Sequence, residues 1–233
     1  MESNNLKKHQ PCVILFAKAP IPGHVKTRLA KDMGETRTLS LYWNFVRDSV
    51  DKITSAGHYL KIFHDPPGSL PLMQDWLGQR HEYFLQEGVN LGLKMANAFI
   101  RVFSSGIHQA VLMGADFPDL PAMILADALS GLDTHAAVIG PTLDGGYYLI
   151  GFNADSFLTA VFENIPWSTS GVFEKTMSCF TTTGARVKQL PKWRDIDTCD
   201  DLKILIQSLT RHPEHCPHTA AYLTRIGLIP DSE

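Results

Sequence analysis

Short apolar runs alternate along the chain with longer stretches in which apolar residues recur every three or four positions. The apolar runs are rich in β-branched and aromatic residues and predict strands, at 12–16, 59–64, 81–85, 111–113, 136–140, 147–152 and 186–190. The amphipathic stretches predict helices, at 35–56, 72–77, 122–129, 172–180, 198–209 and 219–226, with one more after residue 92. This alternation is typical of an α/β fold with a mostly parallel, helix-covered sheet.

The segment from Pro141 to Gly146 departs from the alternation of predicted strands and helices. It is dense in turn residues, and the apolar run 147–152 follows it without room for a crossover helix. A connection this short joins antiparallel strands, so we expect a mixed sheet. Asp144-Gly145-Gly146 has two interpretations. It is a good hairpin signal, or its glycines let the backbone press against a sugar or acceptor while Asp144 binds hydroxyls.

Length and composition indicate one large domain. The 233 residues are 44% hydrophobic, and we place the domain at 12–210, after a flexible leader at 1–11 and before a tail with a short helix at 211–233. Four scattered cysteines without a C-x-x-C pair predict neither a zinc ribbon nor a disulfide framework.

Charge and hydropathy limit the classes of partner that we expect for this protein. The formal charge of −3 offers no basic footprint for nucleic acid or anionic lipid, which leaves a small polar ligand as the expected partner. No apolar run approaches the roughly 20 residues that span a bilayer, and the polar start MESNNLKKHQP lacks the apolar middle of a secretory signal. We therefore expect no membrane span and a cytoplasmic protein, and the sequence leaves its oligomeric state open.

The run Val111–Met113 stops abruptly at Gly114, Ala115 and then Asp116. Ligands of open α/β sheets bind beyond the carboxyl ends of the strands, so Asp116 is a candidate to meet a metal or a phosphate. The alternative is that Asp116 and Asp119 only supply turn and helix-start chemistry ahead of Pro121. We assign the helix start to Asp119 and the functional role to Asp116.

The loop after the first strand carries positive charges, on Lys18, Lys26 and Arg28, and leads into a short helical stretch. Fixed cations beside a helix N-terminus favour a phosphate site. Gly23 stands alone, so the loop is neither a Walker A loop nor a G-x-G-x-x-G motif. A solvated basic loop is the alternative.

Two further strand ends carry candidate residues. Gly88 and Gly92 flank a loop that can touch a ligand, although a plain turn with Asn90 as helix cap explains it equally well. Asp195 and Asp197 form a second acidic pair after the last strand, and Asp197 could instead cap the helix that follows. The tail sequence HPEHCPH suggests a metal cluster, but its prolines and terminal position favour a loop.

Four stretches, in this order, resemble the DUF2064 family of bacterial proteins: KAPIPGHVKTRLA, LMGADFPDL, GPTLDGGYYLIG and LPKWRDIDT. That family is of the glycosyltransferase-A type, similar to nucleotide-diphospho-sugar transferases and named in part as arsenosugar-biosynthesis glycosyltransferases. The resemblance covers about residues 12 to 204. It implies a three-layer α/β sandwich with a mixed, mostly parallel sheet and a nucleotide over the first strand's loop.

The resemblance also implies roles for individual residues. A divalent Mg²⁺ or Mn²⁺ would be held by Asp116, the counterpart of an Asp-x-Asp motif, and by Asp197. Lys18, Lys26 and Arg28 would bind the phosphates, with Gly23, Gly88 and Gly92 lining the nucleotide. The acceptor would lie beside Gly145 and Gly146, with Trp167 as a stacking wall. An inverting transfer needs a carboxylate that deprotonates the acceptor, and we assign this role to Asp144 because the other candidates already have a role. The sequence departs from the pattern at Asn90, where an acidic residue is expected, and at Lys94, where Arg is expected.

Three functions follow. The first is a metal-dependent glycosyltransferase that moves a sugar from a nucleotide-diphospho-sugar to a small acceptor. The second is a nucleotidyltransferase that takes an NTP and releases pyrophosphate, suggested by Lys26-Thr27-Arg28, which resembles the guanylyltransferases of cofactor biosynthesis. The third is a non-catalytic nucleotide-sugar-binding protein. Release of NDP or of pyrophosphate separates the first two.

Overall fold

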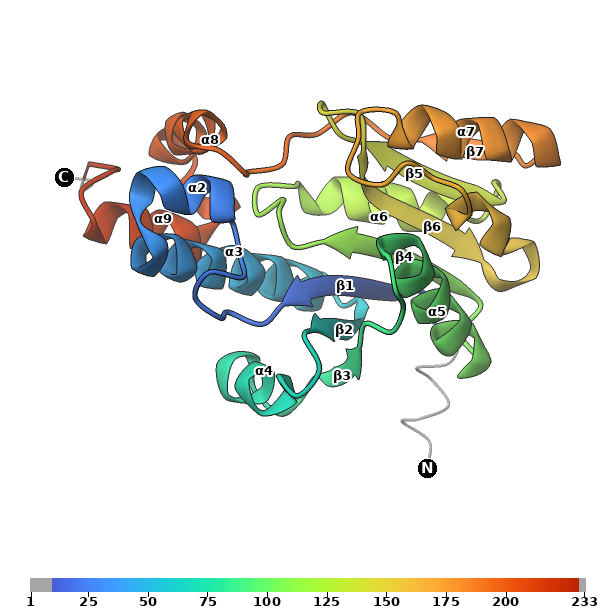
Figure 1. Ribbon diagram of the computed structural model, residues 1–233, viewed down its shortest axis with the longest axis horizontal. Coiled ribbons are helices and arrows are strands. Elements are labelled where there is room, and N and C mark those ends of the chain that lie inside the picture. The colour runs from blue at the N-terminus through green and yellow to red at the C-terminus, as the bar shows by residue number, and fades with distance from the viewer. Residues whose placement is uncertain (1–9, 231–233) are drawn as a thin grey trace.

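A seven-stranded mixed sheet forms the centre of the computed structural model, which describes residues 10–230 (Figure 1). Its strands are β1 (Cys12–Lys18), β2 (Tyr59–Asp65), β3 (Glu82–Leu85), β4 (Gln109–Gly114), β5 (Ala137–Pro141), β6 (Tyr147–Asn153) and β7 (Val187–Gln189). They lie in the order β3-β2-β1-β4-β6-β5-β7. β6 runs antiparallel to both β4 and β5, and the other pairs are parallel. The predicted mixed, mostly parallel sheet is confirmed.

The central strands are buried on both faces, as expected for a helix-covered sheet. In β1, Val13 and Leu15 point into one apolar cluster, while Cys12 and Ile14 point into the other. This separation follows from the two-residue repeat of a strand. Cys12, Cys179, Cys199 and Cys216 are free.

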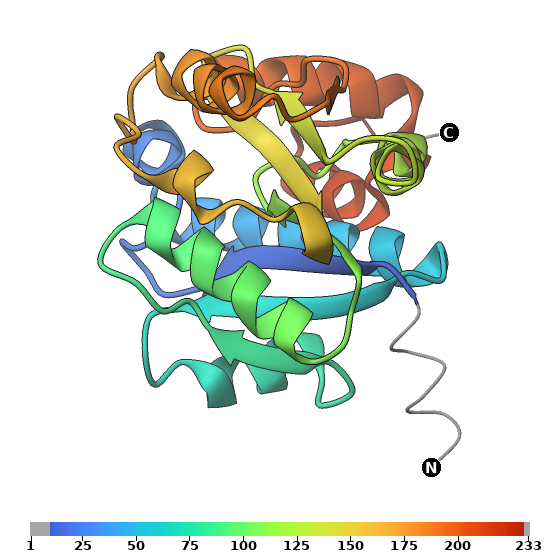
Figure 2. The same cartoon turned by 90° about the vertical axis from the view of Figure 1, so that its right-hand side faces the viewer.

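Helices cover both faces and complete a three-layer sandwich (Figure 2). The helices of the described residues are α2 (Thr27–Met33), α3 (Glu35–Ser55), α4 (Leu70–Leu77), α5 (Leu91–Ser104), α6 (Ala122–Gly131), α7 (Val172–Thr183), α8 (Cys199–Arg211) and α9 (Pro217–Arg225). Buried residues of α3, α4 and α6 join the Val13 cluster, and those of α5 and α7 join the Cys12 cluster. Within residues 10–230, no helix has the length and apolarity to cross a membrane.

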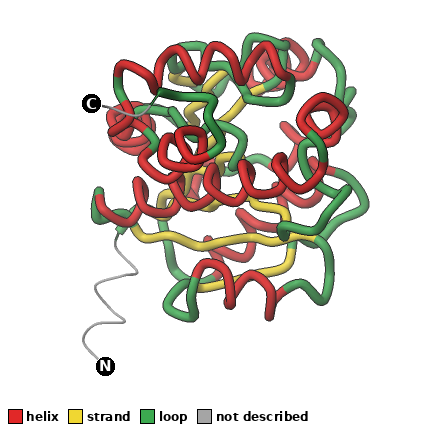
Figure 3. Tube along the Cα trace, turned by 90° about the vertical axis from the view of Figure 1, so that its left-hand side faces the viewer, coloured by secondary structure: helices red, strands yellow, loops and turns green. Residues whose placement is uncertain are grey.

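A third apolar cluster gathers α2, α8 and α9 against α3 at one end of the molecule (Figures 1 and 3). Leu29, Phe45, Leu205 and Leu223 are fully buried or nearly so within it. The helix of the 211–233 tail thus packs on α3, and its core is shared with the domain that we placed at 12–210. Much of the leader, residues 1–9, lies outside the described residues.

Asp48 ties the start of α9 to the middle of α3. Its carboxylate is only 2% exposed and accepts hydrogen bonds from the backbone N–H groups of His218 and Thr219, both at 2.9 Å, and from the Thr219 hydroxyl. Burial raises the pKa of Asp48, and these three donors oppose the rise. The carboxylate satisfies N–H groups that the first turn of α9 cannot satisfy itself.

We expect Asp48→Ala to lower the free energy of unfolding by about 2–4 kcal/mol, because it leaves buried donors without a partner. Urea unfolding followed by circular dichroism measures the change. Asp51→Ala is the matched control: Asp51 is on the same helix but its side chain is 60% exposed, and it contacts only the His218 side chain in the hydrogen bonds of the described chain. A loss no larger than that of the control would contradict the role given to Asp48.

Candidate active site

A cleft of about 760 Å³ opens at one edge of the sheet. β1 and β4 end there, and β6 begins there because it runs antiparallel to β4. Candidate residues from distant parts of the sequence line it, namely Lys18, Lys26, Arg28, Asp116, Asp144, Gly146, Trp167 and Asp197. The edge of the sheet therefore brings together most of the residues predicted to form the site.

Two carboxylates and two cations meet in this cleft. Lys26 Nζ lies 2.6 Å from Asp116 Oδ1 and 4.0 Å from Asp197 Oδ1. Arg28 Nη1 donates to Asp197 Oδ2 at 3.1 Å. The Lys26 side chain is 4% exposed, whereas that of Asp116 is 47% exposed and faces the cleft. The site combines fixed positive charge with accessible carboxylate oxygens.

Backbone geometry sets the position of Lys26. It is the N-cap residue of α2 and adopts a left-handed conformation, with φ 48° and ψ 45°. Such a conformation is uncommon for a residue with a side chain and is often found at functional sites. Leu29, three residues later, is fully buried and anchors the helix.

The segment between β7 and α8 delivers Asp195 and Asp197 to the cleft. Ile196 is buried between them, and its backbone N–H donates to the carbonyl of Asp116 at 3.1 Å. Thr198 caps α8 in a capping box with Asp201, so the alternative in which Asp197 caps that helix is wrong. Asp197 remains available to the cleft.

Asp119 anchors the same segment, and the prediction that it starts α6 is wrong. Its carboxylate accepts a hydrogen bond from Trp193 Nε1 at 3.0 Å. The N-cap residue of α6 is Pro121, without a side-chain cap. The Trp193 indole can reach this carboxylate because two backbone hydrogen bonds, with Pro141 and Leu143, hold Trp193 in place.

Two residues to which the sequence assigns no role, Asp195 and Tyr42, also line the cleft. Burial raises the pKa of Asp195, the negative charge of Asp144 raises it further, and Lys26 opposes the rise. Burial and then Asp116 raise the pKa of Tyr42, whose hydroxyl contacts the backbone of Lys18. The Asp-Ile-Asp spacing was a signal for Asp195, whereas Tyr42 lies inside the predicted helix 35–56, where the apolar repeat gives no signal for a site.

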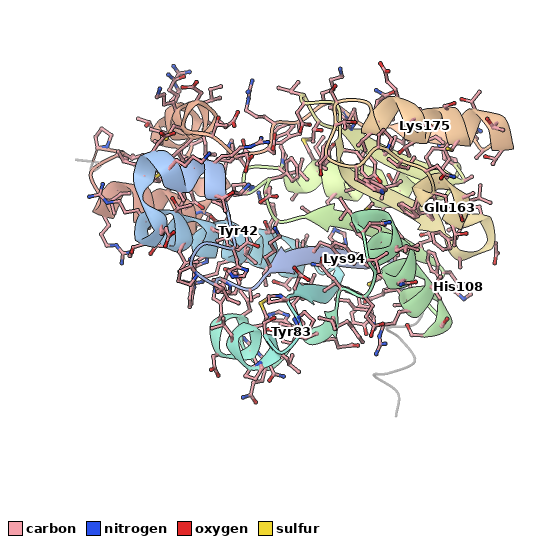
Figure 4. All side chains as sticks on the ribbon, in the orientation of Figure 1. Tyr42, Tyr83, Lys94, His108, Glu163 and Lys175 are labelled. Carbon is pink, nitrogen blue, oxygen red and sulfur yellow. The ribbon has the colours of Figure 1, made fainter. Side chains whose placement is uncertain are left out.

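Figure 4 labels Tyr42 on α3 and Lys94 on α5, which belong to the two opposite helix layers. Lys94 forms an ion pair with Asp65 at the end of β2, with 2.9 Å between Nζ and Oδ1. Lys94, which occupies the position where the family resemblance leads us to expect Arg, is thus held at the end of a strand.

The Asp144-Gly145-Gly146 turn forms a hairpin between β5 and β6, and it also reaches the cleft. Asp144 Oδ1 accepts hydrogen bonds from the Thr142 hydroxyl and from the backbone N–H of Gly146. Gly146 lines the cleft, but Gly145 does not. A Cβ on Gly145 would lie 2.1 Å from the carbonyl oxygen of Ser170, so this glycine lets the turn pack against the 168–171 loop.

We expect Gly145→Ala to lower the free energy of unfolding by at least about 2 kcal/mol. The residue has φ +94°, and its new Cβ would strike Ser170 backbone, which cannot move as a side chain can. Gly146→Ala is the matched control, since its Cβ would approach only side-chain atoms, the Thr142 hydroxyl at 3.1 Å and Asp144 Oδ1 at 3.5 Å. Chemical denaturation of both variants checks the difference, and equal losses would contradict the contact with Ser170.

Gly23, Gly88 and Gly92, the glycines predicted to line the nucleotide, are not part of the cleft lining among the described residues. Asn90 caps α5 by accepting from Leu93 N at 2.9 Å, as the plain-turn alternative predicts. Gly92 is buried, and a Cβ there would lie 2.6 Å from the carbonyl oxygen of Phe162 and 2.7 Å from the Trp167 ring. Its role is to let the Phe162 backbone and the Trp167 ring approach α5.

The far wall of the cleft is apolar. Trp167, Tyr147 and Met95 line it together with Leu91, whose surface is 46% exposed. The Trp167 and Tyr147 rings meet nearly edge to face, with centroids 6.3 Å apart. This wall suits a flat or apolar group, whereas Lys26 and Asp116 contribute charge to the cleft lining.

The tail motif forms a 3₁₀ turn, η3 (Pro213–His215), between α8 and α9. Donor atoms of His212, Glu214 and His215 lie within 4.8 Å of one another, on exposed side chains that do not line the cleft. The turn matches the predicted loop before a short helix.

The chain matches a family model and several solved structures. The model, described as an uncharacterized protein conserved in bacteria (DUF2064), matches residues 50–169. A candidate nucleotide-diphospho-sugar transferase from Desulfovibrio desulfuricans G20 is 37% identical, with a TM-score of 0.89, over 93% of this chain and 95% of that chain. No curated protein sequence matches the chain significantly.

More distant structures share the fold. A 4-diphosphocytidyl-2C-methyl-D-erythritol synthase from Anaerococcus prevotii DSM 20548 is 11% identical, with a TM-score of 0.60, over 88% of this chain and 100% of that chain. A manganese complex of Rv0371c from Mycobacterium tuberculosis H37Rv is 17% identical, with a TM-score of 0.54, over 85% and 98%. These similarities show that the chain and the two proteins share a fold.

Proposed function

This chain belongs to the DUF2064 family, and from that membership and the contents of the cleft we propose that it is a transferase acting on a nucleotide-activated donor. In its finer form, the proposal is a glycosyltransferase that moves a sugar from a nucleotide-diphospho-sugar to a small acceptor. The observation that carries it is the meeting of Lys26 and Arg28 with Asp116 and Asp197 at one sheet edge. The similar Desulfovibrio protein, itself a candidate nucleotide-diphospho-sugar transferase, supports it.

The cations would bind the donor's diphosphate. Lys26 is fixed by burial, and Arg28 is 74% exposed and can follow the ligand. Lys18, which is exposed at the end of β1, adds a third positive charge. Preorganised charges of this kind stabilise the negative charge that develops on a leaving diphosphate.

The residues also fit a divalent ion. Asp116 and Asp197 present oxygen atoms to the same cleft, and Mg²⁺ in phosphate-transfer sites takes one or two carboxylates together with substrate phosphates. These two side chains would hold Mg²⁺ or Mn²⁺, which when bound would neutralise charge on the leaving group. The manganese complex of Rv0371c, a protein of the same fold, is consistent with this choice.

The acceptor would lie between the Asp144 turn and the apolar wall. Asp144 is exposed and lines the cleft, so it can take the proton of an acceptor hydroxyl, while Trp167 would pack against the acceptor or its sugar. The hydrogen bonds from Thr142 and Gly146 N both end on Oδ1 and fix the orientation of the carboxylate. Oδ2 can then face the acceptor.

The second candidate is a nucleotidyltransferase. The Lys26-Thr27-Arg28 sequence places two cations where the triphosphate of an NTP would also bind, and the fold is shared with the Anaerococcus synthase. In this reaction, an acceptor phosphate attacks the α-phosphorus and pyrophosphate leaves. Both candidates use the same charged side of the cleft.

Product analysis tests the two candidates. UDP-, GDP-, CDP- and ADP-sugars, and the four NTPs, are each incubated with the protein, Mn²⁺ and a panel of small hydroxyl- or phosphate-bearing acceptors. We expect NDP and a glycosylated acceptor, and addition of EDTA is expected to stop their formation. Pyrophosphate would identify the second candidate. Metal-independent binding without turnover, unchanged by Asp116→Asn, would identify a non-catalytic binding protein.

A further inference from the structure

Both carboxylates that would hold the divalent ion are already paired with cations of the protein. Lys26 Nζ lies 2.6 Å from Asp116 and 4.0 Å from Asp197, and Arg28 contacts the other oxygen of Asp197 at 3.1 Å. The ammonium group of Lys26 therefore faces the same oxygen atoms that the ion would need. Lys26 and the metal ion would bind the same carboxylate oxygen atoms.

Lys26 differs from Arg28 in how it is held. Its side chain is 4% exposed, against 74% for Arg28, and its backbone forms the left-handed N-cap of α2. A buried ammonium group without a carboxylate partner is costly, so Lys26 stays paired until another anion replaces Asp116. The diphosphate of the donor is such an anion.

We propose that Lys26 competes with the divalent ion for Asp116 and Asp197, so that the ion binds tightly only together with a nucleotide diphosphate. The inference rests on the proposed function, because it takes these two carboxylates as the ion's ligands. The arriving phosphates give the ammonium group new partners and supply further oxygen ligands for the ion. Ion and nucleotide then strengthen each other's binding by the same factor, since such coupling is reciprocal.

The Lys26→Met variant tests the competition directly. Methionine keeps an unbranched apolar side chain, one heavy atom shorter than that of lysine, and removes the charged ammonium group. We expect Mn²⁺ alone, measured by the electron paramagnetic resonance signal of the free ion, to bind Lys26→Met at least about tenfold more tightly than the wild type. We also compare Mn²⁺ affinity with and without the nucleoside diphosphate that binds most tightly, after correction for Mn²⁺–nucleotide complexes in free solution. The gain in Mn²⁺ affinity on adding this nucleotide is expected to be smaller in the variant than in the wild type.

Lys18→Met is the matched control. Lys18 lines the same cleft and carries the same charge, but it makes no ion pair with Asp116 or Asp197 in the described chain. Its removal is expected to change Mn²⁺ affinity less than about twofold. Thermal unfolding confirms that each variant is folded, and Lys26→Gln replaces Lys26→Met if the latter is not.

Two results would overturn the inference in distinguishable ways. If Mn²⁺ binds the wild type and Lys26→Met equally, and Asp116→Asn removes that binding, the competition is wrong and the proposed metal site stands. If Mn²⁺ binding is the same in the wild type, in Lys26→Met and in Asp116→Asn, the metal site itself is wrong. Tighter binding in Lys26→Met that is lost again in the double variant with Asp116→Asn supports the competition.

Discussion

Asp116→Asn is expected to lower kcat/KM about 1,000-fold, which corresponds to a loss of about 4 kcal/mol of transition-state stabilisation. The amide keeps the shape of the carboxylate but has neither the charge that attracts a divalent ion nor the charge that holds Lys26 at 2.6 Å. Steady-state kinetics in Mn²⁺, with the substrates identified by product analysis, measures the change.

Asp119→Asn is the control for this variant. Asp119 lies on the same loop, but its carboxylate accepts from Trp193 Nε1 and is not part of the cleft lining within residues 10–230. The amide oxygen can still accept that hydrogen bond, so we expect less than about a threefold change in kcat/KM. Similar losses in the two variants would show that Asp116 acts through the loop's structure and not through the substrate or the ion.

The strand ends could be predicted from the sequence because apolar runs and turn residues are local signals. Asp116 and Lys26 were found in this way, since each follows a strand that the pattern identifies, and parallel strands bring such ends to one edge. The antiparallel β6 was equally predictable, because the link from Pro141 to Tyr147 is too short for a crossover. Local sequence patterns were therefore enough to predict where the cleft lies.

Roles that depend on contacts between distant segments could not be predicted. Asp119 binds Trp193, 74 residues away, and Gly145 packs against Ser170. The sequence predicts that Gly92 binds a ligand, but the space beside it is filled by the Phe162 backbone and the Trp167 ring. A glycine or an aspartate after a strand has the same local signal whether it contacts a ligand or another loop, so only the packed structure separates the two.

Asp144→Asn is expected to lower kcat about 100-fold or more and to leave the affinity for the donor nearly unchanged. The amide oxygen can still accept the hydrogen bonds from Thr142 and Gly146 N, so the turn keeps its shape, but the amide cannot take a proton from the acceptor. Kinetics with saturating donor, together with the dissociation constant of the nucleotide sugar, separate the two effects.

The size of this effect also depends on the reaction. A sugar hydroxyl or other alcohol must lose a proton as it attacks, whereas an acceptor phosphate is already ionised at neutral pH and needs no base. A glycosyltransferase is therefore expected to lose activity in Asp144→Asn, and a nucleotidyltransferase is expected to retain activity within a few-fold of the wild type. If NDP is the product and kcat is unchanged in Asp144→Asn, another group must accept the proton, and the role assigned to Asp144 is wrong.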